Sequence, residues 1–276
     1  MGGAERNARK KRQAQMAGGS KAVAAARRAD SDRRKLFVGV GVVVVLLAAV
    51  IGGVIVYNNQ KNTTEGKDIQ VSSSTSQQAD DALANIPVTR DGGVVAVGKP
   101  GAKVTLDVYE DFLCPVCHQF EDTYGTNIEK HVADGTVQVR YHMLPMLNER
   151  SDPAGYSMDS ANAGLCAADA GMFPQYHKNL FDNQPEEGSR GWDDQQLAKL
   201  GTDLGIKSAD FTTCVTSGKY DSLVQQDWDE VQQATYLQQD FGNGQKGFGT
   251  PTIAVGQKVV DTTKSGWLDK LVESAS

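Results

Sequence analysis

Two cysteines with two residues between them, Cys114 and Cys117, stand where a strand-like run ends and a helix-like run begins. The preceding run, Val104–Tyr109, is rich in aliphatic and β-branched residues and predicts a strand. In the following run, apolar residues recur every three or four positions, at Phe120, Tyr124, Ile128 and Val132. This spacing is typical of one helix face, so we predict a helix that begins at the two cysteines.

A thiol at the start of a helix is suited to redox chemistry. Unpaired backbone N–H groups and the positive end of the helix dipole stabilise a thiolate and lower the pKa of the first cysteine. Pro115 fits the first helical turn, because the N–H that it lacks would have no partner there. An accessible thiol of low pKa beside a second, resolving thiol favours exchange between dithiols and disulfides.

The same residues match two other kinds of site. Cys114, Cys117 and His118 form the C-x-x-C-H signature of a covalently attached c-type haem. A structural zinc site is a third interpretation, but it needs four ligands, and Cys166 and Cys214 are isolated in the sequence. We favour the redox dithiol and expect neither a metal nor a cofactor.

The other strand candidates occur in an order that supports this interpretation. One lies at Thr136–Tyr141, and near the C-terminus Thr250 and Pro251 lead into a short apolar run at Thr252–Val255. Proline cannot donate a hydrogen bond within a sheet, so at the start of a strand it has a turn or cis role. Further elements are expected at Val94–Val97, Lys258–Val260 and, as a closing helix, Trp267–Glu273. A strand, a helix that carries the cysteines, a second strand and a late strand led by proline follow the order of a thioredoxin fold.

A membrane anchor is expected ahead of this domain. Leu36–Tyr57 is a run of 22 uncharged, mostly aliphatic residues. As a helix, it would be roughly 33 Å long, enough to cross the hydrocarbon core of a bilayer. A cleaved signal peptide is the competing interpretation, but its apolar region is usually shorter and ends in small residues. We therefore expect one uncleaved N-terminal transmembrane helix.

Charge predicts the orientation of that helix. Residues 1–35 hold 11 Lys/Arg against 3 Asp/Glu, a net charge of +8, whereas residues 58–276 hold 17 against 31, a net charge of −14. Basic flanks stay in the cytoplasm, so the N-terminus is expected in the cytoplasm and the domain outside the cell membrane. The basic arm lacks aromatic residues and suits anionic lipids, and no nucleic-acid partner is expected. All four cysteines lie beyond the anchor, which fits an oxidising compartment.

Composition divides the rest of the chain. Residues 58–85 are polar and poor in apolar side chains, which predicts a flexible linker. Residues 145–247 interrupt the strand pattern with five helix candidates, at Tyr156–Ala170, Phe173–Phe181, Asp193–Leu204, Ser208–Ser217 and Tyr220–Leu237. The expected organisation is a basic cytoplasmic tail (1–35), an anchor (36–57), a linker (58–85), a thioredoxin-like domain made of 86–144 and 248–276, and an all-helical insertion (145–247).

Four segments of the chain carry a family resemblance: Tyr109–Phe120, Ala163–Phe181, Phe211–Cys214 and Gly249–Thr252. With these segments in this order, residues from about 92 to 276 resemble the DsbA-like thioredoxin family of extracytoplasmic oxidoreductases. The chain is most similar to the membrane-anchored members found in Gram-positive-type bacteria. The resemblance implies an α/β thioredoxin-like fold with an inserted all-helical domain, and the activity of a thiol–disulfide oxidoreductase. The pattern around His118 recurs in that family without haem.

The resemblance also implies roles for individual residues. Cys114 would be the attacking cysteine and solvent-accessible, and Cys117 would be the shielded, resolving cysteine. Thr250 and Pro251 would form a cis-proline pair that lies against the active-site disulfide and offers the backbone of Thr250 to a substrate strand. Asp111 matches an acidic position that precedes the motif in the family, and it equally suits a turn or helix-start residue.

Two departures from the family affect the expected chemistry. Val116 stands where strongly oxidising members carry histidine, and valine offers no cation or donor to a thiolate, so we expect a milder oxidant. Val108 stands where thioredoxin relatives commonly bury a carboxylate. Proton transfer at Cys117 therefore needs another route, such as Glu110 or water.

The expected function is the introduction of disulfides into exported, cysteine-containing proteins by a membrane-tethered enzyme. A membrane redox partner, quinone-linked as the resemblance implies, would restore the disulfide. The alternatives are a disulfide reductase or isomerase on the same fold, including one that serves cytochrome maturation, a c-type haem electron carrier, and a binding module without redox activity.

Cys166 and Cys214 are expected to form a structural disulfide. Thiols outside the cell tend to oxidise, and if Cys114 pairs with Cys117, these two are the only partners left. Both fall within helix candidates of the insertion, and the family resemblance allows such a pair. Two buried free thiols are the alternative.

Overall fold

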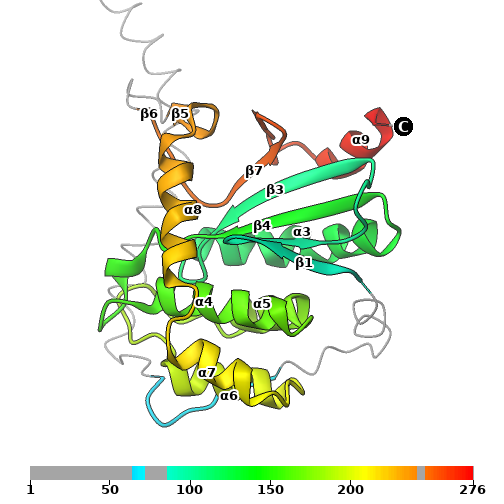
Figure 1. The fold of residues 1–276 in the computed structure, drawn as a ribbon. Coiled ribbons are helices and arrows are strands. Elements are labelled where there is room, and N and C mark those ends of the chain that lie inside the picture. Colours follow the sequence, from blue (N-terminus) through cyan, green and yellow to red (C-terminus); the bar gives the residue numbers. More distant parts are fainter. Residues whose placement is uncertain (1–63, 72–85, 241–245, 276) are drawn as a thin grey trace, which may run out of the picture. The chain divides into compact units, whose positions relative to one another are not determined.

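A computed structural model of the chain describes residues 64–71, 86–240 and 246–275 (Figure 1). These residues belong to one compact unit, and the chain's other unit falls outside the described ranges. The anchor predicted at residues 36–57 also lies outside them. Within the described ranges, no helix is both long enough and apolar enough to cross a membrane.

A central sheet of six strands runs in the order β1-β2-β4-β3-β7-β8. Its strands are β1 (Val88–Asp91), β2 (Val94–Val97), β3 (Val104–Glu110), β4 (Val137–Met143), β7 (Thr252–Val255) and β8 (Lys258–Val259). The pair β3 and β4 is parallel, as strands joined through a helix can be, and the other neighbours are antiparallel. The sequence predicts all of these strands except β1, whose four residues have neither an alternating pattern nor an apolar run.

Helices flank this sheet, and most of them occur in the sequence between β4 and β7. The helix that follows the cysteines is α3 (Pro115–Ala133), and α9 (Trp267–Ser274) closes the chain. Between β4 and β7 lie η1 (Asn148–Arg150), α4 (Tyr156–Asp169), α5 (Phe173–Asp182), α6 (Asp194–Asp203), α7 (Ala209–Thr216), α8 (Asp221–Gln233) and η2 (Thr235–Leu237). The short strands β5 (Gln239–Asp240) and β6 (Lys246–Gly247) pair with each other in the same stretch, so the insertion is not all-helical as predicted. The five predicted helices of residues 145–247 are present as α4 to α8.

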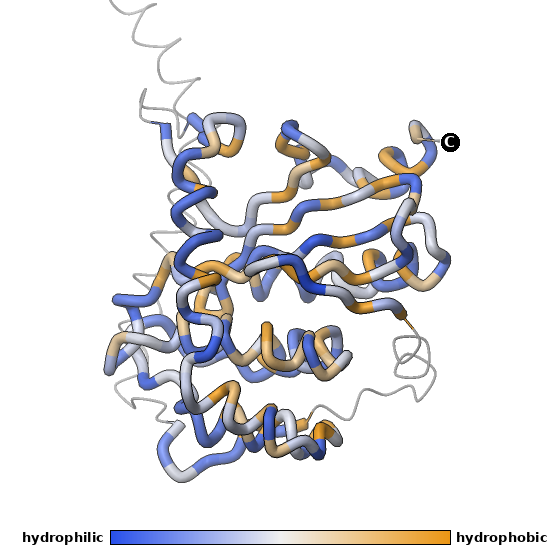
Figure 2. Tube along the Cα trace, viewed as in Figure 1, coloured by the Kyte–Doolittle hydropathy of each residue, from blue (hydrophilic) through white to orange (hydrophobic). Residues whose placement is uncertain are grey.

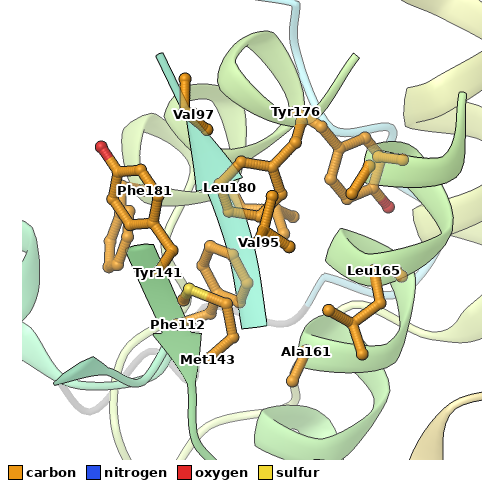
Figure 3. Packing of buried hydrophobic residues seen from close by; sticks show 14 of the residues in the cluster. Val95, Val97, Phe112, Tyr141, Met143, Ala161, Leu165, Tyr176, Leu180 and Phe181 are labelled. Atoms are coloured by element: carbon orange, nitrogen blue, oxygen red, sulfur yellow. The ribbon is translucent and has the colours of Figure 1, made fainter. Parts of the chain in front are cut away.

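One face of the sheet is continuous with the packing of the inserted helices. Side chains of β2, β4, α4 and α5 interlock there around Phe112, as Figure 3 shows. Val95 of β2, Leu165 of α4 and Leu180 of α5 are wholly buried in this core. The helical insertion and the sheet therefore share one hydrophobic core, which holds the segment before the cysteines in place.

The opposite face of the sheet has a smaller core of its own. Tyr109 of β3 and Ala254 of β7 pack there with Val231 of α8 and Leu237 of η2. Most of α8 is hydrophilic, as the tube in Figure 2 shows, so it contributes few side chains to this core. β3 is buried along nearly its whole length, because its successive side chains point alternately into the cores on the two faces of the sheet.

Residues 64–71 differ from the flexible linker that their composition predicts. The Thr64 hydroxyl donates to the carbonyl of Gly191 at 2.6 Å, and the Gln196 amide donates to the carbonyls of Thr64 and Lys67, each at 2.6 Å. Ile69 is buried with the main core. One apolar side chain and hydrogen bonds between side chains and backbone carbonyls hold this segment, and its polar composition does not reveal these contacts.

Candidate redox-active site

The turn that joins β3 to α3 is built around the carboxylate of Asp111. Its Oδ1 accepts hydrogen bonds from the Leu113 N–H and the Ser157 hydroxyl, both at 2.8 Å, and its Oδ2 accepts from the Leu147 N–H at 2.7 Å. Burial raises the pKa of Asp111 to about 6, although these hydrogen bonds act in the opposite direction. Asp111 therefore ties the turn before the cysteines to the loop after β4 and to α4.

The two cysteines occupy the first turn of α3. Cys114 is the N-cap residue, Pro115 is the first helical residue, and the N–H groups of Cys117 and His118 donate to the Cys114 carbonyl at 3.0 and 3.2 Å. Both cysteines are present as thiols. Of the two residues between them, Val116 has one of the few large apolar side chains that are exposed in the described part of the chain.

The loop before β7 covers Cys114. The peptide bond between Thr250 and Pro251 is cis, as the sequence predicts, and the Cys114 thiol donates to the Thr250 carbonyl at 3.5 Å. Cys114 is consequently only 4% exposed and Cys117 is 0% exposed. Cys114 is more exposed than Cys117, as predicted. The prediction that Cys114 is solvent-accessible is wrong, because its position at a helix start does not show that a distant loop covers it.

The two thiols differ in acidity. A hydrogen bond from the Cys117 thiol makes the largest contribution to lowering the pKa of Cys114 to about 7; Thr250 and the N–H groups of Val116 and Cys117 also contribute, while burial opposes them. Burial raises the pKa of Cys117 well above its ordinary value, and the charges of Cys114 and Glu110 raise it further. At neutral pH, the thiolate therefore forms at Cys114.

A group of buried ionisable side chains is coupled electrostatically to the cysteines. Glu110, at the end of β3, is fully buried, and its Oε2 lies 3.1 Å from Nε2 of His177 on α5. Burial raises the pKa of Glu110 to about 8 and lowers that of His177. Glu121, on α3, belongs to the same group, and burial followed by the charge of Glu110 raises its pKa well above the ordinary value. The nearest ligand-type atoms of these three residues lie within 4.8 Å of one another, so they are the side chains here that could hold a metal.

Gln184, just beyond α5, is a positioning residue that the sequence does not reveal. Its side-chain amide donates to the carbonyl of Phe112 at 2.9 Å and to the carbonyl of Cys114 at 3.0 Å. The helical insertion thus holds the N-terminal end of α3 directly. A glutamine after a helix has no motif of its own, and only its position in space shows this role.

The surroundings of His118 do not favour attachment of a haem. Its Nε2 lies 3.3 Å from Oδ2 of Asp122, one turn further along α3, and the two side chains are 35% and 66% exposed. Thioether bonds to a porphyrin would need both cysteine sulfurs to be accessible, and Cys117 is wholly buried. The arrangement suits exchange between neighbouring sulfurs instead.

The remaining two cysteines are joined to each other. Cys166 of α4 and Cys214 of α7 form a disulfide, as predicted. The side chain of Asn162 joins the same helices, because its Nδ2 donates to the Val215 carbonyl at 3.0 Å and its Oδ1 accepts from the Tyr220 N–H at 2.9 Å. With these sulfurs bonded, no second cysteine pair remains to complete a four-cysteine zinc site.

Comparison with known proteins places this site in a recognised family. A family model described as Thioredoxin matches residues 90–273. A solved structure of the reduced disulfide bond oxidoreductase DsbG from Mycobacterium tuberculosis has 27% sequence identity and a TM-score of 0.51, and the match covers 71% of this chain and 96% of that chain.

Two curated relatives match about two thirds of this chain. Disulfide bond formation protein D of Bacillus subtilis is 27% identical over 191 residues, which cover 68% of this chain and 78% of that protein. The serine/threonine-protein kinase PknE of Mycobacterium tuberculosis is 30% identical over 191 residues, which cover 67% of this chain. The matched region spans only 32% of the length of PknE.

Proposed function

The chain belongs to the thioredoxin family and is a DsbA-like thiol–disulfide oxidoreductase, and from that premise we propose that it introduces disulfides into exported proteins. One observation carries the proposal. The thiol of Cys114, with a pKa of about 7, lies beneath the carbonyl of Thr250 and beside a wholly buried Cys117. This arrangement makes one sulfur the point of attack and keeps the other as the leaving and resolving thiol.

The proposed reaction starts from the Cys114–Cys117 disulfide. A substrate thiolate attacks Sγ of Cys114, the sulfur–sulfur bond breaks, and Cys117 leaves with the electron pair and takes up a proton. A second substrate thiolate then attacks the substrate sulfur of the mixed disulfide and releases Cys114 as a thiolate. Two electrons thus pass from the substrate to the enzyme. A membrane redox partner, quinone-linked by analogy with the family, removes them again.

Substrate specificity in this scheme is broad. Val116 provides an exposed apolar surface beside Cys114, and the carbonyl of Thr250 offers a backbone acceptor to an extended segment. Backbone pairing and one apolar contact discriminate little between sequences. Unfolded, cysteine-containing chains are the substrate class that fits.

We place the protein in the cell membrane with its N-terminus in the cytoplasm and residues 86–275 outside. The charge difference between residues 1–35 and 58–276, together with the apolar run Leu36–Tyr57, supports this topology. The Cys166–Cys214 disulfide also supports it, because such bonds persist in oxidising compartments. Reporter fusions after residue 60 test it: an enzyme active only outside the cytoplasm should be active there.

A trapping experiment tests the catalytic assignment. In the Cys117→Ser variant, mixed disulfides with reduced, unfolded substrates should accumulate through Cys114, because the resolving thiol is gone. The Cys114→Ser variant is the matched control and should form none. Complexes linked through Cys117, or exchange activity that survives in Cys114→Ser, would contradict the assignment.

A reductase or isomerase is the second candidate, because the pKa of Cys114 of about 7 is near that of the thioredoxin thiol. The reduction potential of Cys114–Cys117 distinguishes the two directions. An oxidase should equilibrate with glutathione buffers at about −180 to −120 mV, whereas a potential at or below about −270 mV, the value of thioredoxin, would identify a reductase.

A further inference from the structure

Glu110, Glu121 and His177 come from three separate elements and converge on one point. Glu110 ends β3, Glu121 lies in the second turn of α3, and His177 lies on α5 of the helical insertion. Their nearest ligand-type atoms all lie within 4.8 Å of one another. Such a distance is compatible with ligands around a single ion, since metal–ligand bonds of about 2.0–2.2 Å leave neighbouring ligand atoms some 3–4 Å apart.

Both carboxylates of this cluster have unused acceptor capacity. Oε1 of Glu110 and Oε1 of Glu121 are buried without a hydrogen-bond partner among the described residues. Glu110 is fully buried, and its one ion-pair contact in the described part of the chain is with His177. Buried carboxylate oxygens normally have hydrogen bonds, a cationic partner or a metal. The two carboxyl groups also interact with each other, which requires a shared proton or a cation between them, and the imidazole beside them favours a cation.

A cavity beside the cluster provides access. It has a volume of about 140 Å³ and is lined by Glu121 and His177 together with Thr126, Glu129 and Lys178. A space of this size holds several water molecules. Waters in the cavity can complete the coordination of an ion, and the opening between α3 and α5 gives the ion a path to the cluster.

We propose that Glu110, Glu121 and His177 bind one divalent ion of the first transition series, for which Zn²⁺ is the probe. Imidazole nitrogen combined with carboxylate oxygen suits Zn²⁺ and its neighbours, whereas Ca²⁺ and Mg²⁺ prefer ligand sets made of oxygen alone. Three protein ligands with an open position toward water are a common zinc arrangement. The ion would fasten α5 of the helical insertion to β3 and α3.

Binding of Zn²⁺ to the full-length chain tests the proposal. The Cys114–Cys117 pair is first oxidised, so that no thiolate can act as a ligand. Calorimetric titration should then show one bound ion per chain. In separate melting curves, the melting temperature should rise with the Zn²⁺ concentration, because an ion that binds only the folded state stabilises it. Glu121→Gln and His177→Gln should each lower the affinity at least about tenfold, since even residues behind the ligands contribute that much.

The pair His131 and Asp269 provides the matched control. His131 lies on α3 and Asp269 on α9, and the double variant His131→Asn/Asp269→Asn removes an imidazole and a carboxylate 2.9 Å apart while leaving the buried cluster and the lining of its cavity intact. Its affinity for Zn²⁺ should equal that of the unchanged chain. Melting curves in chelator establish that each variant is folded before its affinity is compared.

A measurement on the unchanged chain keeps the test independent of mutant folding. The chain has four histidines, so their imidazole resonances can be followed individually by NMR. Substoichiometric Zn²⁺ should shift those of His177 and leave His118, His131 and His142 unaffected. Three outcomes would overturn the proposal. They are no saturable binding by the oxidised chain, an affinity of Glu121→Gln and His177→Gln equal to that of the unchanged chain, and loss of binding in the double control variant. The first outcome would indicate that the two carboxyl groups share a proton instead.

Discussion

Thr250 contributes to the environment of Cys114 through both its backbone and its side chain. Its carbonyl accepts a hydrogen bond from the thiol at 3.5 Å. Its hydroxyl oxygen is buried without a hydrogen-bond partner in the described part of the chain, and contact with Thr250 contributes to the lowered pKa of Cys114. A hydroxyl that is unpartnered beside a neutral thiol becomes a useful donor when that thiol loses its proton.

The Thr250→Val variant should therefore raise the pKa of Cys114 above its value of about 7. Valine has nearly the shape of threonine but no donor, and the loss should move the pH midpoint of Cys114 alkylation upward by about one pH unit, or roughly 1.4 kcal/mol. The measurement is the rate of alkylation of the reduced chain between pH 5 and 10. Thr250→Ser keeps a hydroxyl and should restore the original midpoint, and an unchanged midpoint in Thr250→Val would contradict this role.

Among individual residues, the sequence predicts those that belong to a local motif. Cys114 and Cys117 are recognisable from their spacing, and Pro251 from its place before a strand. Gln184 and His177 are not, because each acts only through a neighbour more than 60 positions away in the chain. The burial of Cys114 by Thr250 cannot be predicted from the sequence either, since a motif shows which residues contact each other but not how exposed they remain.

Among the elements, α4 and α7 are held together twice, by the Cys166–Cys214 disulfide and by the side chain of Asn162. Neither contact touches the residues that carry the thiol exchange. We therefore expect the disulfide to contribute to stability without taking part in thiol exchange, and the two effects can be separated by experiment.

Replacing both cysteines, in the variant Cys166→Ser/Cys214→Ser, should lower the free energy of unfolding by about 4 kcal/mol. The reason is the loss of a constraint between positions separated by 48 residues in the unfolded chain. Urea denaturation of the oxidised protein measures the change, and the exchange rate with a reduced substrate at low temperature should stay within about twofold. A large loss of exchange in a variant that remains folded would show that the bond also shapes the active site.

Element boundaries are predicted well where the periodicity is long. The expected helix Phe173–Phe181 is found as α5, Phe173–Asp182, and the expected strand Thr252–Val255 is found unchanged as β7. The strand β1 is missed because Val88–Asp91 holds no apolar run, and the two-residue strands β5 and β6 are missed because they hold no apolar side chain. Residues 64–71 are missed for a different reason: side chain–backbone hydrogen bonds with Gly191 and Gln196 hold them, and their own composition does not reveal such distant partners.

In the whole molecule, a buried polar contact links the sheet to the helix on its second face. His142 of β4 lies between Asp227 of α8, 2.9 Å from its Nδ1, and Asp107 of β3, 3.4 Å from its Nε2. Arg140 pairs with the same oxygen of Asp107 at 3.1 Å, and Tyr109 stacks on the imidazole. Burial alone would lower the pKa of His142, but the hydrogen bonds and charges of the two aspartates outweigh it and raise the pKa.

The raised pKa of His142 determines how the stability of the fold changes with pH. Because the pKa of His142 is higher in the folded state, the contact stabilises the fold fully below about pH 6.5 and loses this contribution as the pH rises through the folded-state pKa. Asp227→Asn should therefore lower the free energy of unfolding by about 3 kcal/mol at pH 6 and by less at pH 9. Asp229→Asn changes an exposed aspartate of the same helix and should have little effect at either pH. A loss in Asp227→Asn that is equal at both pH values would contradict the charged contact.

The pairing of the cysteines has a consequence for how the protein is made. Cys166 pairs with Cys214, and in the oxidised form that we propose Cys114 pairs with Cys117, so that every cysteine would bond to its nearest neighbour along the chain. Four cysteines allow three pairings, and this is the one that a ribosome delivers in order, since the first pair is complete before the third cysteine is synthesised. A chain that meets an oxidant as it emerges can therefore reach its native bonds without reshuffling any of them. The disulfide-introducing enzyme proposed above would then need no isomerase for its own bonds.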